Sequence, residues 1–180
     1  MKLIPHLYAA FMNYYETGIP PVRPLVMDFP EDAATKDIYD QFMLGEGLMA
    51  APLIANTGDS RRVYFPAGTW YELKTGKKIE GGQWLEIAPA LDEIPLYVQA
   101  GTLLVLAKPV EYVGDQEHYE LDVTAYGEAE CSCRLACDDG ASANLPVDMV
   151  PWLTLHASDS ELAIENEDKL YSISSFKRVV

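Results

Sequence analysis

The N-terminal segment carries the apolar pattern of a helix. Apolar side chains recur there every three or four residues, which is the spacing of neighbours on one side of an α-helix. Gly18 is placed to end that helix, and Pro20-Pro21 prevents its continuation. The pattern predicts a helix whose apolar face consists of Leu3, Ile4, Leu7, Tyr8, Phe11, Met12 and Tyr15.

The next segment, Val22–Phe29, is apolar on both sides and is predicted to be a strand. A strand of this kind normally lies inside a parallel sheet that helices cover on both faces. One helix and one strand cannot build such a sheet alone. We therefore expect residues 1–30 to be the end of a larger α/β unit.

From Glu31 onward the pattern is that of an antiparallel β-sandwich. Glu31–Phe42 is expected to hold a short helix or an ordered loop. Short apolar runs follow, separated by Gly-, Pro- and Asn-containing turns, which is typical of sandwich strands. The expected strands are Leu48–Ile54, Arg62–Phe65, Thr69–Leu73, Trp84–Ala88, Leu96–Gln99 and Leu103–Leu106.

A second small β domain is expected after Pro109. Tyr119–Ala125 alternates apolar and polar residues, as a half-buried strand does. Residues 1–110 carry 9 basic and 13 acidic groups and residues 111–180 carry 4 and 15, so the charge balance also shifts near Pro109–Asp115. The expected partner strands are Ala129–Cys137, Val150–His156, Glu161–Glu165 and Leu170–Ser174.

The acidic composition excludes two classes of partner. With 28 Asp and Glu against 13 Lys and Arg, the formal net charge is −15. Phosphate backbones and anionic membrane surfaces are held by basic side chains, so we expect neither nucleic acid nor membrane as a partner. No apolar run approaches the roughly 20 residues that cross a bilayer, and no signal peptide is recognisable. The default location is cytoplasmic, and a periplasmic or secreted location applies if an upstream signal is missing.

Three cysteines share one face of an expected strand. Cys131, Cys133 and Cys137 lie at odd positions with Leu135, and buried free cysteines behave as small hydrophobes. We favour core packing over zinc binding with His156, because structural zinc sites bring their thiols in pairs on turns. No metal site and no cofactor are predicted.

The tryptophans allow two interpretations. Trp70 and Trp152 are candidates for a sugar-stacking platform, together with Tyr71 and Trp84. The alternative is that these rings fill the sandwich core and its rim, since large aromatics dominate buried area. For Trp70 and Trp84 we favour the core.

The remaining polar groups give no catalytic signal. Asp138-Asp139-Gly140 is expected to form a turn, with calcium coordination as the alternative. The other adjacent acidic pairs do not converge from different elements, as the carboxylates of a glycosidase must. His6, His118 and His156 are isolated, and no nucleophile elbow, phosphate loop or zinc-binding helix motif occurs.

A co-linear series of motifs runs along the first 107 residues. It begins at Leu3–Tyr8 and includes the run Glu16–Leu25 with its Arg23-Pro24-Leu25. It continues through Asp28–Asp32, Asp40–Gly45, Ala51-Pro52, Arg62–Tyr71, Thr75-Gly76, Gly81–Trp84, Ile94–Val98 and Ala100-Gly101. In its order and spacing this series resembles the end of the catalytic barrel in glycoside hydrolase family 31, which includes α-glucosidases and α-xylosidases.

The resemblance implies a division into three parts. Residues 1–30 would be the last helix and strand of a (β/α)8 barrel, residues 31–108 a proximal β-sandwich, and residues 109–180 a distal β domain. Arg23, Asp28 and Asp40 would be structural residues. Glu46 stands where an Asp is common in the family, and the segment after Pro109 matches poorly.

The resemblance also implies that the catalytic residues lie elsewhere. Family members are retaining enzymes with one Asp as nucleophile and another as general acid/base, about 5–5.5 Å apart. Neither motif occurs in this sequence, so no catalytic residue is assigned and the chain by itself is expected to be inactive.

Two functional hypotheses follow. The first is the non-catalytic C-terminal region of a retaining α-glycosidase, whose α-linked oligosaccharide substrate binds in the absent barrel. The second is a stand-alone carbohydrate-binding β module. The helix and strand at the N-terminus favour the first, and their apolar faces are expected to drive self-association.

Overall fold

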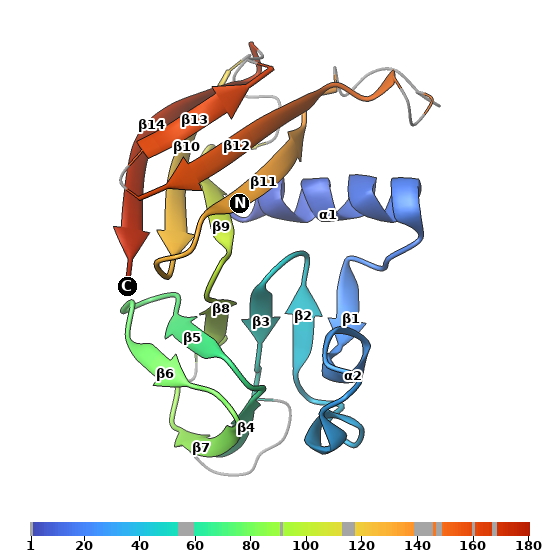
Figure 1. Cartoon of the computed structure of the whole chain (residues 1–180), viewed down its shortest axis with the longest axis vertical. Coiled ribbons are helices and arrows are strands. Elements are labelled where there is room, and N and C mark those ends of the chain that lie inside the picture. Colours follow the sequence, from blue (N-terminus) through green and yellow to red (C-terminus); the bar gives the residue numbers. More distant parts are fainter. Residues whose placement is uncertain are drawn as a thin grey trace. The chain divides into compact units, whose positions relative to one another are not determined.

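A computed structural model describes residues 2–53, 60–90, 92–112, 118–138, 146, 149–159, 161–166 and 169–180. The chain forms two compact units (Figure 1). One, which we call the continuous unit, is Val22–Ala100; the other, the split unit, combines Met1–Pro21 with Gly101–Val180. Each is described by itself.

The continuous unit consists of short antiparallel strands. One sheet has the strand order β1-β2-β3-β8-β5-β6, and a second pairs β4 with β7. A short helix and a 3-10 turn lie between β1 and β2. The elements are β1 (Val22–Pro24), α2 (Leu25–Asp28), η1 (Ala33–Thr35), β2 (Phe42–Leu44), β3 (Leu48–Ala50), β4 (Arg61–Phe65), β5 (Thr69–Glu72), β6 (Lys78–Glu80), β7 (Gln83–Ile87) and β8 (Leu96–Gln99).

The core of this unit is built from large side chains. Trp70, Phe65 and Tyr97 are fully buried and pack with aliphatic residues from both sheets. The Phe65 ring meets Tyr97 edge-on at 4.7 Å between centroids. At the turn before β7, Gly81 lies so close to the Pro66 carbonyl that a Cβ atom would be 1.9 Å from its oxygen. Only glycine fits there.

The expectation of a doubly buried strand over Val22–Phe29 was wrong. The strand ends at Pro24, pairs antiparallel with β2, and exposes Val22 and Pro24. The chain then turns helically, and the Phe29 amide donates to the Leu25 carbonyl at 2.9 Å.

The split unit is a two-sheet sandwich with a helix. Figure 1 shows α1, in dark blue, beside the yellow and orange strands of this unit. One sheet has the order β14-β10-β9 and the other β11-β12-β13. The elements are α1 (Ile4–Thr17), β9 (Leu103–Ala107), β10 (Tyr119–Tyr126), β11 (Cys131–Ala136), β12 (Trp152–Ser158), β13 (Glu161–Glu165) and β14 (Tyr171–Val179).

The core of the split unit contains aliphatic residues and thiols from both sheets. The predicted buried positions of β10, Leu121, Val123 and Ala125, are confirmed, but Thr124 is buried as well, so the alternation does not extend to the end of the strand. The predicted helix is also confirmed, and it ends at Gly18, whose φ of 79° lies in the left-handed region. The pairing of β14 with β10 is parallel, unlike every other strand pair that the structure describes.

The short-strand pattern predicted most elements. The two missed strands, β2 and β6, have three residues each and are too short for an alternation to show. β3 ends at Ala50, earlier than expected. The mainly β fold is confirmed. The part of the chain that the structure describes contains no barrel, so the assignment of residues 1–30, 31–108 and 109–180 to parts of a larger enzyme stays a prediction.

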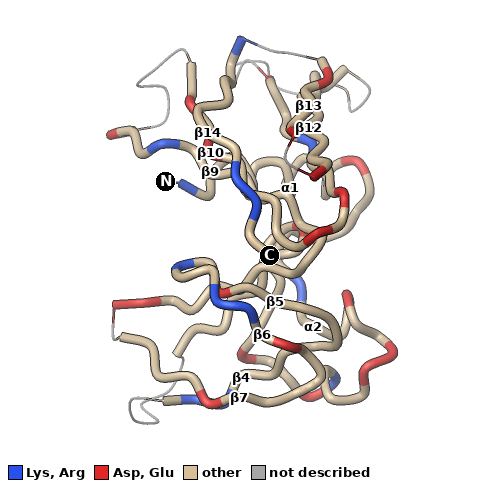
Figure 2. The backbone as a smooth tube through the Cα atoms, turned by 60° about the vertical axis from the view of Figure 1, so that its left-hand side comes forward, with Lys and Arg blue, Asp and Glu red and all other residues tan. Residues whose placement is uncertain are grey.

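Charged residues are distributed over both units. Figure 2 shows basic positions dispersed among acidic ones along the described backbone rather than gathered in one stripe. No helix in the described ranges is long and apolar enough to span a membrane.

Candidate functional site

Trp70 does not offer a sugar platform. Its side chain is 0% exposed, and its indole Nε1 donates to the Pro66 carbonyl at 2.8 Å. Phe29 and Phe65 lie against it at 6.0 and 6.4 Å between ring centroids. The core interpretation of Trp70 is therefore correct, and its candidacy as a sugar-stacking residue was wrong because no ring face reaches solvent.

Trp152 is partly buried, and one of its ring faces is covered by the chain itself. The Arg134 guanidinium carbon lies 3.9 Å from the centre of the Trp152 ring, the geometry of a cation–π contact. The Trp152 Nε1 donates to the Glu16 carboxylate at 3.1 Å. These contacts occupy one face and the Nε1 of the Trp152 ring, which the sequence analysis had named as a candidate sugar-stacking platform.

Trp84 was expected in the core, and that expectation was wrong. It is 40% exposed on β7 and contacts Tyr64 at 5.2 Å between ring centroids. The Arg62 guanidinium lies 5.1 Å from its ring centre. Because β4 and β7 form a two-stranded ladder apart from the larger sheet, this ring lies at the rim of the unit.

Arg23 is a structural arginine, as expected. It is buried and donates to both Asp28 carboxylate oxygens at 2.6 and 2.7 Å and to the Gly45 carbonyl at 2.9 Å. Hydrogen bonding to Asp28 raises the pKa of Arg23, and the charge of Glu46 adds to this. The contact ties α2 to the turn between β2 and β3.

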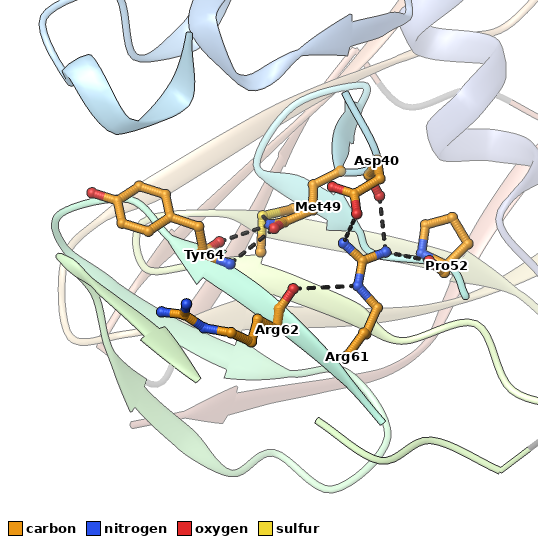
Figure 3. A network of polar contacts seen from close by, with 7 residues as sticks. Asp40, Met49, Pro52, Arg61, Arg62 and Tyr64 are labelled. Carbon is orange, nitrogen blue, oxygen red and sulfur yellow. Dashed lines mark hydrogen bonds and ion pairs between the residues drawn. The ribbon is translucent and has the colours of Figure 1, made fainter. Parts of the chain in front are cut away.

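A second buried polar network centres on Arg61 and the segment before β2 (Figure 3). The Arg61 guanidinium pairs with the Asp40 carboxylate at 2.7 Å and donates to the carbonyls of Asp40 and Pro52. Beside it, the buried amide of Gln41 donates to the Tyr64 carbonyl and accepts from the Tyr64 N–H, both at 2.8 Å. Gln41 therefore satisfies two main-chain groups of β4, and the network is structural.

Sequence reasoning from residue types missed Gln41 and Arg61. The signal that was present is position: Asp40 and Gln41 directly precede the apolar run Phe42–Leu44. A polar pair at the start of a buried segment needs partners inside the fold.

Two tyrosine hydroxyls in this unit have raised pKa values. Burial and a hydrogen bond to Asp32 at 2.6 Å raise the pKa of Tyr64 to about 12. Burial, with a smaller contribution from the charge of Glu72, raises the pKa of Tyr97 to about 12. Within the described residues the Tyr97 hydroxyl has no hydrogen-bond partner. Neither group is poised to exchange a proton near neutral pH.

The cysteine interpretation is confirmed. Cys131 and Cys137 are buried in the core of the split unit, and Cys133 packs against it. Burial raises the pKa of Cys131, which keeps its thiol protonated and unreactive. Among the described residues, no group of three His, Cys, Asp or Glu side chains could hold a metal ion.

The expected turn at residues 138–140 lies mostly outside the described residues, which include only Asp138. Its carboxylate accepts a hydrogen bond from the Tyr8 hydroxyl of α1. Of the three histidines, His6 is buried, whereas His156 lies on the surface near Glu165 at 3.6 Å.

Comparison with known proteins identifies the family. Residues 18–104 match the glycosyl hydrolase family 31 C-terminal domain. The chain is a C-terminal region of glycoside hydrolase family 31. In this region Arg23 and Asp28 form the first polar network described above, and Asp40, Gln41 and Arg61 take part in the second.

The relatives are much longer than this chain. It is 35% identical to a 1,6-alpha-glucosyltransferase of Sporosarcina globispora over 79% of its own length and 11% of that protein. It is 37% identical to alpha-glucosidase 2 of Bacillus thermoamyloliquefaciens over 57% of its own length and 13% of that protein. This chain thus spans only about an eighth of the length of these two relatives, which are named a glucosyltransferase and a glucosidase.

A solved structure supports the same assignment. The family 31 alpha-xylosidase of Xanthomonas citri matches with a TM-score of 0.85 and 30% identity. The match covers 99% of this chain and 20% of the xylosidase. Both β units therefore have counterparts in a family 31 enzyme, although the segment after Pro109 carried little of the motif resemblance.

Proposed function

We propose that this chain is the non-catalytic C-terminal region of a retaining α-glycosidase that cleaves α-linked glucosides or xylosides. The observation that carries the proposal is the match of residues 18–104 to the family 31 C-terminal domain. The relatives that share it include glucosidases and xylosidases, so the substrate class is an α-linked oligosaccharide bound outside this chain.

The contacts that the carboxylates make within the chain support a non-catalytic role. A retaining glycosidase needs two carboxyl groups about 5–5.5 Å apart that face the sugar. Asp28 and Asp40 are held by arginines, Asp32 accepts from the Tyr64 hydroxyl, and Glu16 accepts from Arg134 and Trp152. These four carboxylates are thus engaged in structural contacts within the chain.

The exposed face of α1 supports a docking role for the split unit. Phe11, Tyr14 and Tyr15 are 56%, 50% and 55% exposed. An aromatic surface of this kind is normally covered in the complete molecule. We propose that the upstream part of the glycosidase covers it, and that copies of the isolated chain associate through it.

The size of the native gene product tests the proposed function. An antibody against this chain detects it in a lysate of the source cells, and peptide mass spectrometry identifies the band. We expect a product several times the 20.0 kDa of this chain, with upstream peptides that include the Asp-bearing motifs. A native product of 20 kDa would overturn the proposal.

Activity of the purified chain is a second test. Aryl α-glucoside and aryl α-xyloside are the substrates, and we expect no turnover. Turnover that persists through further purification and co-elutes with the chain would show that the catalytic groups lie within it.

Size-exclusion chromatography with light scattering tests the docking face. We expect the chain to self-associate, and the variant with Phe11→Glu, Tyr14→Glu and Tyr15→Glu to be monomeric. Tyr39→Glu is the control, because Tyr39 is exposed in the other unit. A wild-type chain that stays monomeric at high concentration would count against self-association without touching the family assignment.

A further inference from the structure

Helix α1 rests on the split-unit sandwich by a face that the apolar pattern predicted only in part. Pro5 is buried, Ala9 packs against the core, and Glu16 contacts Arg134 and Trp152. These positions follow helical spacing and lie on one side of α1, which contacts β9 and β11. Of the predicted stripe, Ile4, Phe11 and Tyr15 are exposed, whereas the other members are half-buried.

The burial of apolar surface alone does not explain which face of α1 lies against the strands. The face toward the strands offers Pro5 and Ala9, and Leu7, Tyr8 and Met12 are half-buried. Phe11 and Tyr15, in contrast, are more than half exposed. Burying the two aromatic rings as well would remove further apolar surface from water. The polar contacts of the observed face therefore add to apolar burial in selecting this orientation.

The polar contacts of Glu16 supply that preference. Arg134 of β11 donates to both carboxylate oxygens of Glu16 at 3.3 Å, and Trp152 of β12 donates to one of them at 3.1 Å. Arg134 also stacks on the Trp152 ring at 3.9 Å, so the three side chains contact one another pairwise. Hydrogen bonds from three donors to one carboxylate are directional, so they fix the position of the Glu16 side chain more strictly than an apolar contact would.

A second polar contact lies on an adjacent side of α1. The Tyr8 hydroxyl donates to the Asp138 carboxylate just after β11. Both contacts therefore join α1 to β11 or to the short segment after it, and a rotation of the helix would break both at once.

We infer that Glu16, Arg134 and Trp152 form a clasp that fixes the rotation of α1 on the split unit and keeps its aromatic face turned to the outside. Glu16 is the positioning residue of this clasp. The inference concerns contacts within the split unit, so it stands or falls separately from the proposed glycosidase function.

Hydrogen exchange measured by mass spectrometry on the full chain tests the clasp. In Glu16→Ala we expect the α1 amides to exchange about tenfold faster or more, because hydrogen bonds to a charged group are lost. The amides of β10 and β14 should keep their wild-type rates. Glu16→Gln keeps an acceptor for Trp152 and should show a smaller change.

Two further variants separate the contacts. Trp152→Phe removes the Nε1 donor but keeps a ring under Arg134, so a small acceleration of α1 exchange is expected. Arg134→Lys keeps the charge but loses the planar two-donor contact and should have a larger effect. The matched control is Glu120→Gln, which breaks the exposed ion pair with Lys108 in the same unit and should leave α1 unchanged.

Hydroxyl-radical footprinting reports on the rotation itself. In the wild-type chain Phe11, Tyr14 and Tyr15 should be readily modified, and in Glu16→Ala their modification should fall as the helix turns toward its apolar preference. The clasp is overturned if α1 exchange and aromatic modification in Glu16→Ala both equal those of Glu120→Gln. It is also overturned if exchange accelerates equally in α1, β10 and β14, because that result indicates general destabilisation.

Discussion

The continuous unit and the split unit pair their main-chain groups by different means. Among its described residues, the continuous unit has no strand longer than five residues, whereas β14, β10 and β12 in the split unit have nine, eight and seven. Long strands pair most of their N–H and carbonyl groups with a neighbouring strand. Short strands leave a larger share of these groups unpaired at their ends.

Side chains supply the missing partners in the continuous unit. Gln41 pairs with both main-chain groups of Tyr64, and Arg61 donates to the carbonyls of Asp40 and Pro52. The split-unit core instead holds aliphatic side chains and thiols, and its long-range contacts such as that of Glu16 with Arg134 lie nearer the surface. In the continuous unit, side chains thus pair backbone groups that the short strands leave open, and in the split unit Arg178 of β14 does the same for the carbonyls of Gly127 and Ala129.

The largest effect is expected where the continuous unit buries its largest side chain. Trp70→Ala should destabilise that unit by about 4 kcal/mol, since it opens a cavity and leaves the Pro66 carbonyl unpaired. Urea unfolding followed by unit-resolved hydrogen exchange measures the loss. The matched control is Trp84→Ala at the exposed rim, and equal losses for both variants would contradict the assignment of Trp70 to the core.

The split unit should respond to loss of an aliphatic side chain. Leu155→Ala removes a fully buried side chain from β12 and should cost about 3 kcal/mol. Hydrogen exchange should accelerate in β9–β14 and not in β1–β8. Ile164→Ala on β13 is the exposed counterpart and should change little. Equal acceleration in both units would mean that they unfold as one.

The role of side chains as backbone partners is tested at Gln41. Gln41→Leu leaves the N–H and carbonyl of Tyr64 buried without these partners and should cost about 2 kcal/mol. Gln83→Leu is the control, because Gln83 also donates to a carbonyl but is exposed. Denaturant midpoints compare the two variants. A neutral Gln41→Leu would show that short strands do not need this contact.

The smallest effect concerns the pH dependence of stability. The pKa of Tyr97 is about 12 in the folded chain, against about 10 when unfolded, so the unfolded state loses its proton first as the pH rises. The stability is therefore complete below pH 10 and falls as the pH approaches 12. Tyr64 contributes in the same direction.

Tyr97→Phe should flatten that alkaline fall and leave stability at neutral pH within about 1 kcal/mol, because the hydroxyl has no partner among the described residues. Thermal unfolding between pH 7 and 11.5 measures it. Tyr39→Phe, at an exposed tyrosine, should leave the pH profile unchanged. An identical alkaline fall in Tyr97→Phe and wild type would show that the Tyr97 hydroxyl is not the group responsible.

Sequence patterns that involve only neighbouring residues predicted most of this fold. The turn residues and the alternation along Tyr119–Ala125 located the strands because both signals depend on neighbouring residues alone. The early end of β1 at Pro24 was not predictable in this way, since the turn after it is fixed by Arg23 meeting Asp28 and the Gly45 carbonyl.

The candidate site residues were harder to predict because their roles depend on distant partners. The sequence shows a tryptophan at position 152, but not that Arg134 and Glu16 come to meet it. Likewise the helix was correct and its buried face only partly so, because the apolar stripe contains no information about a carboxylate contact 118 residues away.

The split unit also has a consequence for synthesis. Its helix α1 leaves the ribosome before residues 22–100, and its strand β14 leaves after them. At about 5–20 residues per second, roughly 10–30 s separate the two. Because β14 completes the sheet beside β10, this sandwich closes only after Val179 has been synthesised, although the strands that α1 contacts, β9 and β11, are made earlier. The continuous unit can fold meanwhile, so the order of translation itself separates the folding of the two units in time.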